Sequence, residues 1–184
     1  MTEAERLLAA HGRSLKICEV GVGSGAFLSA LRKRFTTAGI SISCWVGLDI
    51  DAAALEVARI NCAGEDIPLR LAESDILSEL TSNEEPDFIY AYPPWGDRFA
   101  PNDDFEGTEW ELLHRALPQI SCYSVGGKTR IHEEILESAV ARFPSCEVHI
   151  FNDYLPMTDV ERILARFPGL VLSLIHISEP TRPY

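Results

Sequence analysis

The feature that most constrains this chain is a glycine-rich stretch near its amino-terminal end, from Ile17 to Leu28. An apolar run over 15–22 breaks into three glycines at alternate positions, Gly21, Gly23 and Gly25, and an apolar helical pattern follows. Glycine accepts a positive φ and lets a ligand approach the backbone closely, and the first N–H groups of the next helix face that ligand. A strand, a glycine turn and a helix in this order are typical of the first nucleotide-binding unit of an open α/β sheet.

Two ligand classes fit this turn. The pattern Gly21-x-Gly23-x-x-Ala26 satisfies the dinucleotide motif, whereas Glu19-x-Gly21-x-Gly23-x-Gly25 resembles motif I of the class I S-adenosylmethionine-dependent methyltransferases. A carboxylate two residues before the first glycine would repel a pyrophosphate, but it suits S-adenosylmethionine, which carries an ammonium and a sulfonium. Glu19 therefore favours the methyltransferase interpretation, and a nicotinamide-dependent oxidoreductase remains the alternative.

Acidic residues follow the next two predicted strands. Asp49 stands at the carboxyl end of the strand 42–50, where it could accept hydrogen bonds from a ribose diol. The adjacent Ile50 belongs to the same predicted cofactor pocket, and Asp51 is predicted to cap the helix 52–61. Asp75 and Ile76 follow the strand 68–74, where an acid resembles the methyltransferase residue that binds the adenine amino group.

A proline loop follows the fourth predicted strand, 87–92. Tyr92 leads directly into Pro93, Pro94 and Trp95. Consecutive prolines have a fixed φ and no N–H, so the loop is stiff and the preceding carbonyls can act as acceptors. Those carbonyls can bind the N–H donors of a planar group while the indole ring stacks on its face.

At this point the chain resembles the amino-methylating class I methyltransferases, whose motif IV is Asn/Asp/Ser-Pro-Pro-Tyr/Phe/Trp. It is most similar to the release-factor glutamine-amide methyltransferases and the related "methyltransferase small domain" proteins. Supporting matches are Ala58-Arg59-x-Asn61 and the segment 118–127 with the helix predicted over 131–143. The resemblance covers about 2–171, and it departs from the family at Tyr92, which stands where the family has Asn.

The resemblance implies methyl transfer from S-adenosylmethionine to the nitrogen of a planar amide or amino group, preferably a protein glutamine. The cofactor-binding residues are then Glu19, Gly21, Gly23, Gly25, Asp49, Ile50, Asp75 and Ile76, and the catalytic loop is Tyr92, Pro93, Pro94 and Trp95. The alternatives are an rRNA base amino-methyltransferase, an NAD-dependent oxidoreductase and a non-catalytic S-adenosylmethionine-binding fragment.

Composition narrows the partners. The 184 residues carry a formal net charge of −12, which disfavours RNA held by bulk electrostatics and favours a release-factor-like protein or a small-molecule acceptor. We expect a cytoplasmic protein, since no apolar run could span a membrane and five dispersed cysteines without a CxxC pair suit reduced thiols. The dispersed histidines predict no metal site.

The predicted fold is α/β, a doubly wound and mostly parallel sheet of the class I methyltransferase, Rossmann-like type. Further elements are expected as helices near Leu7, over 26–36 and over 110–117, a helical turn at 77–80 and a polar loop at 81–86. We also expect an acidic loop at 98–107, a strand over 147–154, a helix over 157–167 and the start of a sixth strand at 169–171. We expect residues 1–171 to form one methyltransferase domain, as a fragment whose carboxyl-terminal edge strands are missing. Residues 172–184 resemble a translated sequencing adaptor and are predicted to be an artefactual tail.

Overall fold

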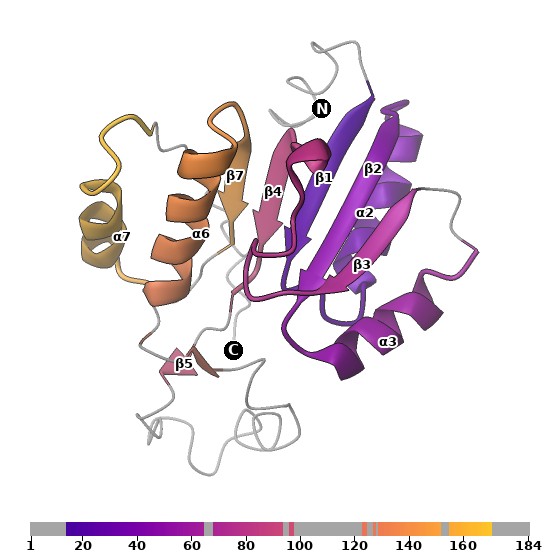
Figure 1. Cartoon of the computed structure of the whole chain (residues 1–184), viewed down its shortest axis with the longest axis horizontal. Coiled ribbons are helices and arrows are strands. Elements are labelled where there is room, and N and C mark those ends of the chain that lie inside the picture. The colour runs from indigo at the N-terminus through magenta and orange to yellow at the C-terminus, as the bar shows by residue number, and fades with distance from the viewer. Residues whose placement is uncertain are drawn as a thin grey trace, which may run out of the picture.

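A computed structural model describes residues 14–64, 68–93, 96–97, 123–124, 127, 129–151 and 155–170. Its centre is a sheet of five strands that all run parallel, in the order β3-β2-β1-β4-β7 (Figure 1). The strands are β1 Leu15–Val20, β2 Ile42–Asp49, β3 Leu69–Glu73, β4 Phe88–Ala91 and β7 Glu147–Ile150. This arrangement confirms the predicted doubly wound α/β fold.

The helices lie between the strands along the chain and after the last of them. They are α2 Ala26–Thr37, α3 Ala52–Asn61, the short 3-10 helix η1 Ser82–Glu84, α6 Arg130–Arg142 and α7 Met157–Leu164. Two short strands, β5 Gly96–Asp97 and β6 Tyr123–Ser124, pair with each other outside the main sheet. The predicted helices 26–36, 52–61 and 131–143 agree with α2, α3 and α6 within one residue at each end.

The strand order reverses beside β1. From β1 the chain adds β2 and then β3 on one side, and it later returns to place β4 and β7 on the other side. In an open parallel sheet, ligands bind outside the carboxyl ends of the strands at such a switch point. The crevice expected here lies beyond β1 and β4, at the edge where the arrowheads in Figure 1 end.

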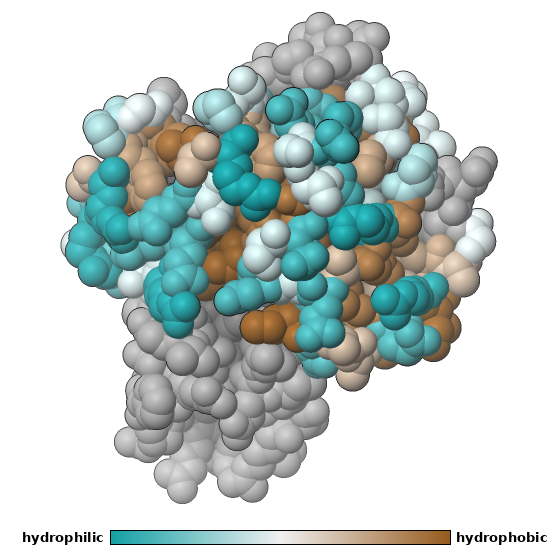
Figure 2. All heavy atoms as spheres, viewed as in Figure 1, coloured by the Kyte–Doolittle hydropathy of each residue, from teal (hydrophilic) through white to brown (hydrophobic). Residues whose placement is uncertain are grey.

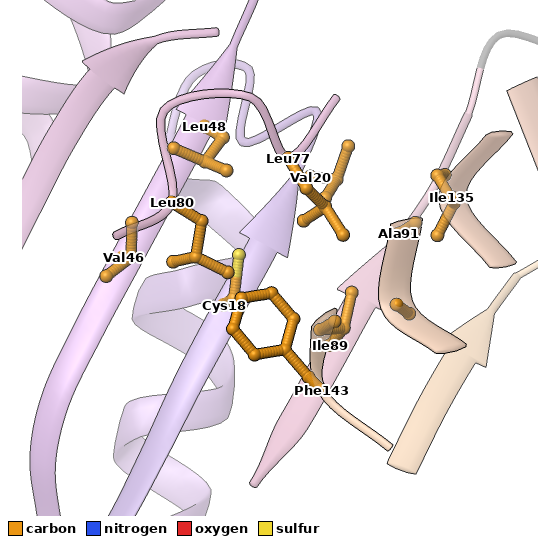
Figure 3. Packing of buried hydrophobic residues seen from close by; sticks show 11 residues of the cluster. Cys18, Val20, Val46, Leu48, Leu77, Leu80, Ile89, Ala91, Ile135 and Phe143 are labelled. Atoms are coloured by element: carbon orange, nitrogen blue, oxygen red, sulfur yellow. The ribbon is translucent and has the colours of Figure 1, made fainter. Parts of the chain in front are cut away.

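The sheet has a hydrophobic core on each face because both faces are covered by helices or loops. On one face α2 and α3 contribute Leu28, Phe35 and Leu55, which pack on residues of β1, β2 and β4 such as Trp45. On the other face α6 and the segment after β3 cover the strands (Figure 3). This second cluster consists of Cys18, Val20, Val46, Leu48, Leu77, Leu80, Ile89, Ala91, Ile135, Ala139 and Phe143.

Three details differ from the sequence-based expectations. The expected helical turn at 77–80 is a hydrogen-bonded turn, and the 3-10 helix η1 instead forms in the predicted polar loop. It forms there because Thr81 and Glu84 make a reciprocal capping box. Strand β7 ends at Ile150, before the expected end at 154, and α7 ends at Leu164, before 167.

Several other expectations fall elsewhere in the chain. Residues 169 and 170 are not in a strand, so the expected sixth strand does not begin at Gly169. The expected helices near Leu7 and over 110–117, the acidic loop 98–107 and the tail 172–184 lie outside the described residues.

The surface in Figure 2 is mostly hydrophilic, with apolar atoms showing between the polar side chains. No helix in the described ranges is long and apolar enough to cross a membrane. Cys18, Cys44, Cys62 and Cys146 carry free thiols. Burial raises the pKa of Cys146 to about 12, so this thiol stays protonated and unreactive near neutral pH.

Candidate functional site

The glycine loop, residues 21–25, leaves the carboxyl end of β1 and is tied to the neighbouring strand. The backbone N–H groups of Gly21 and Val22 both donate to the carbonyl oxygen of Leu48, at 2.8 and 3.0 Å. Gly21, Gly23 and Gly25 all have a positive φ, of 76°, 52° and 74°. The loop therefore folds back over the end of the sheet in a conformation that favours glycine.

The space around the Cβ position differs between Gly25 and Gly23. A Cβ on Gly25 would lie 2.9 Å from the Sγ atom of Cys62 and 3.4 Å from the Cβ of Ala58, so Gly25 lets α2 pack closely against α3. A Cβ on Gly23 would meet nothing within 4 Å. Gly23 thus faces open space, as a backbone that receives a ligand should.

Asn61 holds the loop from a distance in the sequence. Its side-chain amide donates to the carbonyl oxygen of Ser24 at 2.9 Å, from the end of α3. From the sequence alone, Ala58 and Asn61 were only matches to a family pattern. The structure gives both a physical role, because Ala58 packs under Gly25 and Asn61 fixes Ser24.

Asp49 lies at the crevice, where the sequence placed it, and it also braces the loop. One carboxylate oxygen accepts from the N–H of Gly23 at 2.8 Å and the other from the N–H of Asp51 at 3.0 Å. A carboxylate has about four lone-pair directions, so acceptor capacity remains for a ribose diol. Asp51 caps α3 as predicted, accepting from the N–H of Ala53 at 2.9 Å.

Glu19 is almost fully buried at the end of β1, with 4 % of its surface exposed. Burial raises its pKa to about 8, and the nearby Asp49 carboxylate adds to this rise. The indole N–H of Trp45 opposes the shift, but the two groups do not reach hydrogen-bonding geometry. Both the Oε2 atom of Glu19 and the Nε1 atom of Trp45 lack a hydrogen-bond partner among the described residues.

A tight turn after β3 brings the third acidic position to the same edge. The N–H of Ser74 donates to the backbone carbonyl of Asp49 at 2.8 Å, which joins this turn to the end of β2. The buried Ser74 hydroxyl donates to the carbonyl of Ile76 at 3.0 Å and accepts from the N–H of Glu79 at 3.2 Å. Ser74 was not among the predicted site residues, although a serine directly after a strand is a signal for a side-chain-stabilised turn.

This turn presents the residues predicted to hold adenine. Asp75 is exposed, and Ile76 has a positive φ of 53°, which is uncommon for a β-branched residue. Ile50, after β2, is a large apolar side chain with 51 % of its surface exposed. An exposed apolar side chain near an exposed carboxylate suits a planar ring that also carries an amino group.

The proline loop, residues 92–95, begins beside the glycine loop. A Cβ on Gly21 would lie 3.6 Å from the carbonyl oxygen of Tyr92, so the ends of β1 and β4 are in close contact. Tyr92 is 54 % exposed and Pro93 is buried. Pro94 and Trp95 lie outside the described residues, and their roles stay predictions.

An aromatic group that no sequence pattern predicted joins α2, β4 and the end of β7. The ring of Phe27, in the first turn of α2, packs edge-on against Phe151 and Tyr90 at 5.5 and 6.0 Å. Tyr90 in turn stacks on His149 at 5.2 Å. The residues come from three elements that are distant in the sequence, so no local pattern could predict the group.

Comparison with known proteins gives two groups of curated relatives, while no protein-family model matches. The release factor glutamine methyltransferase of Flavobacterium psychrophilum is 29% identical over 91 residues, covering 50% of this chain and 30% of that protein. The ribosomal RNA small subunit methyltransferase C of Haemophilus influenzae is 28% identical over 155 residues, covering 83% of this chain and 42% of that protein. The chain thus spans less than half the length of either relative.

Solved structures share the fold. A ribosomal protein L11 methylase from Lactobacillus delbrueckii has a TM-score of 0.51 at 18% identity, covering 90% of this chain and 69% of that one. The catalytic domain of hMettl16, bound to an RNA hairpin, has a TM-score of 0.61 at 13% identity, covering 92% and 60%. The predicted resemblance to class I methyltransferases is confirmed, and the relatives support S-adenosylmethionine as the cofactor.

Proposed function

We propose that this chain is the cofactor-binding and catalytic domain of an S-adenosylmethionine-dependent methyltransferase that methylates a nitrogen of a planar amide or amino group. One observation carries the proposal: the glycine loop, Asp49 and the carbonyl of Tyr92 meet at the switch point of the sheet. Binding of cofactor and alignment of acceptor both depend on this junction.

The charges around the glycine loop suit a cationic ligand. Glu19 and Asp49 are both carboxyl groups near the loop, and Gly23 faces open space. A pyrophosphate would be repelled by the Asp49 carboxylate and would oppose ionisation of Glu19, whereas an ammonium or sulfonium would be attracted to Asp49 and would favour ionisation of Glu19. This argues for S-adenosylmethionine over NAD, with Asp49 binding the ribose and Asp75 the adenine amino group.

The backbone of the proline loop would aim the acceptor. S-adenosylmethionine would supply an electrophilic methyl group for an in-line displacement at its sulfonium, in which the C–S bond breaks, a thioether leaves and the acceptor nitrogen loses a proton to solvent. The carbonyl oxygens of Tyr92 and Pro93 can accept hydrogen bonds from the acceptor's N–H groups and orient its lone pair, and Trp95 would stack on its plane. Such positioning contributes much of the rate enhancement when no covalent intermediate is needed.

We favour a protein glutamine side chain as the acceptor. The charge of −12 opposes non-specific RNA binding, and glutamine is the acceptor named in the release-factor relatives. An amino group of an rRNA base is the second candidate, since the rRNA methyltransferase aligns with more of this chain than the release-factor methyltransferase does. For either acceptor, Tyr92 cannot provide the hydrogen bond that the Asn of the similar family provides, because the tyrosine hydroxyl lies farther from the backbone than an Asn side-chain oxygen.

Calorimetric titration of the purified chain with S-adenosylmethionine and, separately, with NAD tests the proposal. We expect binding of S-adenosylmethionine alone; binding of NAD alone would move the chain to the oxidoreductases. A methyl-transfer assay then compares a glutamine-containing release-factor peptide with an rRNA fragment. Methylation of the RNA alone would replace the glutamine assignment, and binding without transfer to any acceptor would favour a non-catalytic domain.

A further inference from the structure

Glu19 belongs to a row of side chains that crosses the sheet just before the glycine loop. The strand register pairs Glu19 with Gly47 of β2 on one side and with Tyr90 of β4 on the other, and Tyr90 with His149 of β7. Paired residues of neighbouring parallel strands project to the same face. Glu19 therefore lies on the face that α2 and α3 cover, with the ring of Tyr90 beside it.

None of the described groups around Glu19 supplies a positive charge to it. Asp49 is the charged side chain that acts on it, and its effect is unfavourable to a carboxylate. Tyr90 stays neutral, because burial raises its pKa to about 12, and His149 lies beyond that ring. The charged residues of the two covering helices lie at partly or fully exposed positions: Arg32, Lys33, Arg34, Glu56 and Arg59.

A buried carboxylate without a cation and with one unpartnered oxygen is costly, and such a group binds a proton instead. A cationic ligand in the glycine loop would supply the missing opposite charge. We infer that Glu19 is a proton switch, protonated without cofactor and ionised when S-adenosylmethionine binds, so that binding releases a proton to the solvent. This inference rests on the proposed function, since it requires a cationic cofactor.

The sign of the pH dependence follows. With a pKa of about 8 in the protein without cofactor, Glu19 is mostly protonated at pH 6.5, so binding at that pH releases close to one proton. The association constant then rises by up to about tenfold per pH unit as the pH approaches 8 and levels off above it. The α-amino group of the cofactor titrates near pH 8, and a variant without a titrating group at 19 separates the two contributions.

The experiment is calorimetric titration with S-adenosylmethionine at pH 6.5 in buffers of different ionisation enthalpy. The dependence of the heat on the buffer gives the number of protons released. We expect close to one for the wild type and almost none for Glu19→Gln, which mimics the neutral carboxyl group. Glu56→Gln makes the same substitution at an exposed site on α3 and should behave like the wild type.

Binding by the wild type without proton release would overturn the inference, as would equal release by Glu19→Gln. Absence of any S-adenosylmethionine binding would instead overturn the proposed function. A second measurement does not depend on cofactor or on the folding of a variant: an NMR titration of the ¹³C-labelled Glu19 carboxyl group. A midpoint near pH 8 supports the switch, and an ordinary glutamate midpoint near 4.5 overturns it.

Discussion

Two poorly exposed glutamates in this protein titrate in opposite directions. Burial raises the pKa of Glu19, at the glycine loop, to about 8. Burial would also raise the pKa of Glu84, in η1, but hydrogen bonds from Arg70 and Thr81 outweigh it and lower that pKa to about 2. Arg70 binds Glu84 through two nitrogens, at 2.5 and 2.7 Å.

The difference separates a structural carboxylate from one adapted to a ligand. Glu84 joins β3 to the loop that follows it, and its charge is neutralised within the fold. Glu19 has no such partner among the described residues, one of its oxygens is unpartnered, and it lies two residues before the glycine loop, near Asp49. We therefore expect changes near Glu19 to alter binding and changes near Glu84 to alter stability.

The largest expected effect is on cofactor binding, from Asp49→Ala. This change removes both the proposed ribose acceptor and the brace to Gly23, and we expect the dissociation constant for S-adenosylmethionine to rise about 100-fold or more, equivalent to about 2.7 kcal/mol. Calorimetry measures it. Asp51→Ala is the matched control, since it removes the cap of α3 and should cost about 1 kcal/mol of stability with little change in affinity. Equal affinity of the Asp49→Ala variant and the wild type would show that Asp49 is not part of the cofactor site.

The second effect is the pH dependence of stability in the absence of cofactor. Because the pKa of Glu19 is raised in the folded state, its contribution to stability is fully present below its unfolded pKa of about 4.5 and is lost as the pH rises through about 8. The slope is up to about 1.4 kcal/mol per pH unit within this window. Urea unfolding from pH 5 to 8 should show a decline that Glu19→Gln removes. An identical slope in that variant would place the pKa of Glu19 in its ordinary range.

The third effect is the pH dependence of stability that Glu84 contributes through its pair with Arg70, and its sign is opposite to that of Glu19. The lowered pKa of Glu84 gives stability that is present above its unfolded pKa of about 4.5 and is lost as the pH falls through about 2. Glu84→Gln should destabilise the protein by about 1–2 kcal/mol at neutral pH, a modest figure because Arg70 is partly exposed. Its affinity for S-adenosylmethionine should not change. If Glu84→Gln lost affinity for S-adenosylmethionine but kept its stability, Glu84 would belong to the binding site and not to the structural pair.

The smallest effect is expected from Asn61→Ala, which frees the carbonyl of Ser24 but leaves every charge in place. An exposed hydrogen bond contributes about 1 kcal/mol, so affinity for S-adenosylmethionine should fall several-fold through a looser glycine loop. Calorimetric titration of the Asn61→Ala and Asn61→Asp variants with S-adenosylmethionine measures this change in affinity. An unchanged affinity in both would show that the hydrogen bond from Asn61 does not help to position the loop for the cofactor.

Local pattern was enough to predict several parts of the site. The three alternate glycines after an apolar run predicted the strand, turn and helix that the structure contains, and Asp49 stands at the carboxyl end of β2 as expected. The bracing bond from Asp49 to Gly23 was not predictable, because it joins residues 26 positions apart through a loop conformation. The same holds for Asn61, whose side chain reaches Ser24 only once α3 packs against α2.

Side-chain capping explains why a 3-10 helix forms at Ser82–Glu84, after the helical turn that was expected at 77–80. The stretch 77–84 is short and mixed, so helical periodicity was a weak guide, and the reciprocal bonds of Thr81 and Glu84 placed the 3-10 helix later than expected. Arg70, from β3, stabilises that position. A tertiary contact of this kind has no signal in the window of sequence that it orders.

The sequence by itself determined the class of fold and the edge of the sheet where the ligand residues gather, because glycine, proline and acidic residues at strand ends act through local backbone geometry. Only the tertiary structure decided the charge of Glu19. The same residue type is ionised at 84 and protonated at 19, since a pKa depends on which neighbours burial brings within reach. That difference arises from packing between strands and helices that are distant along the chain.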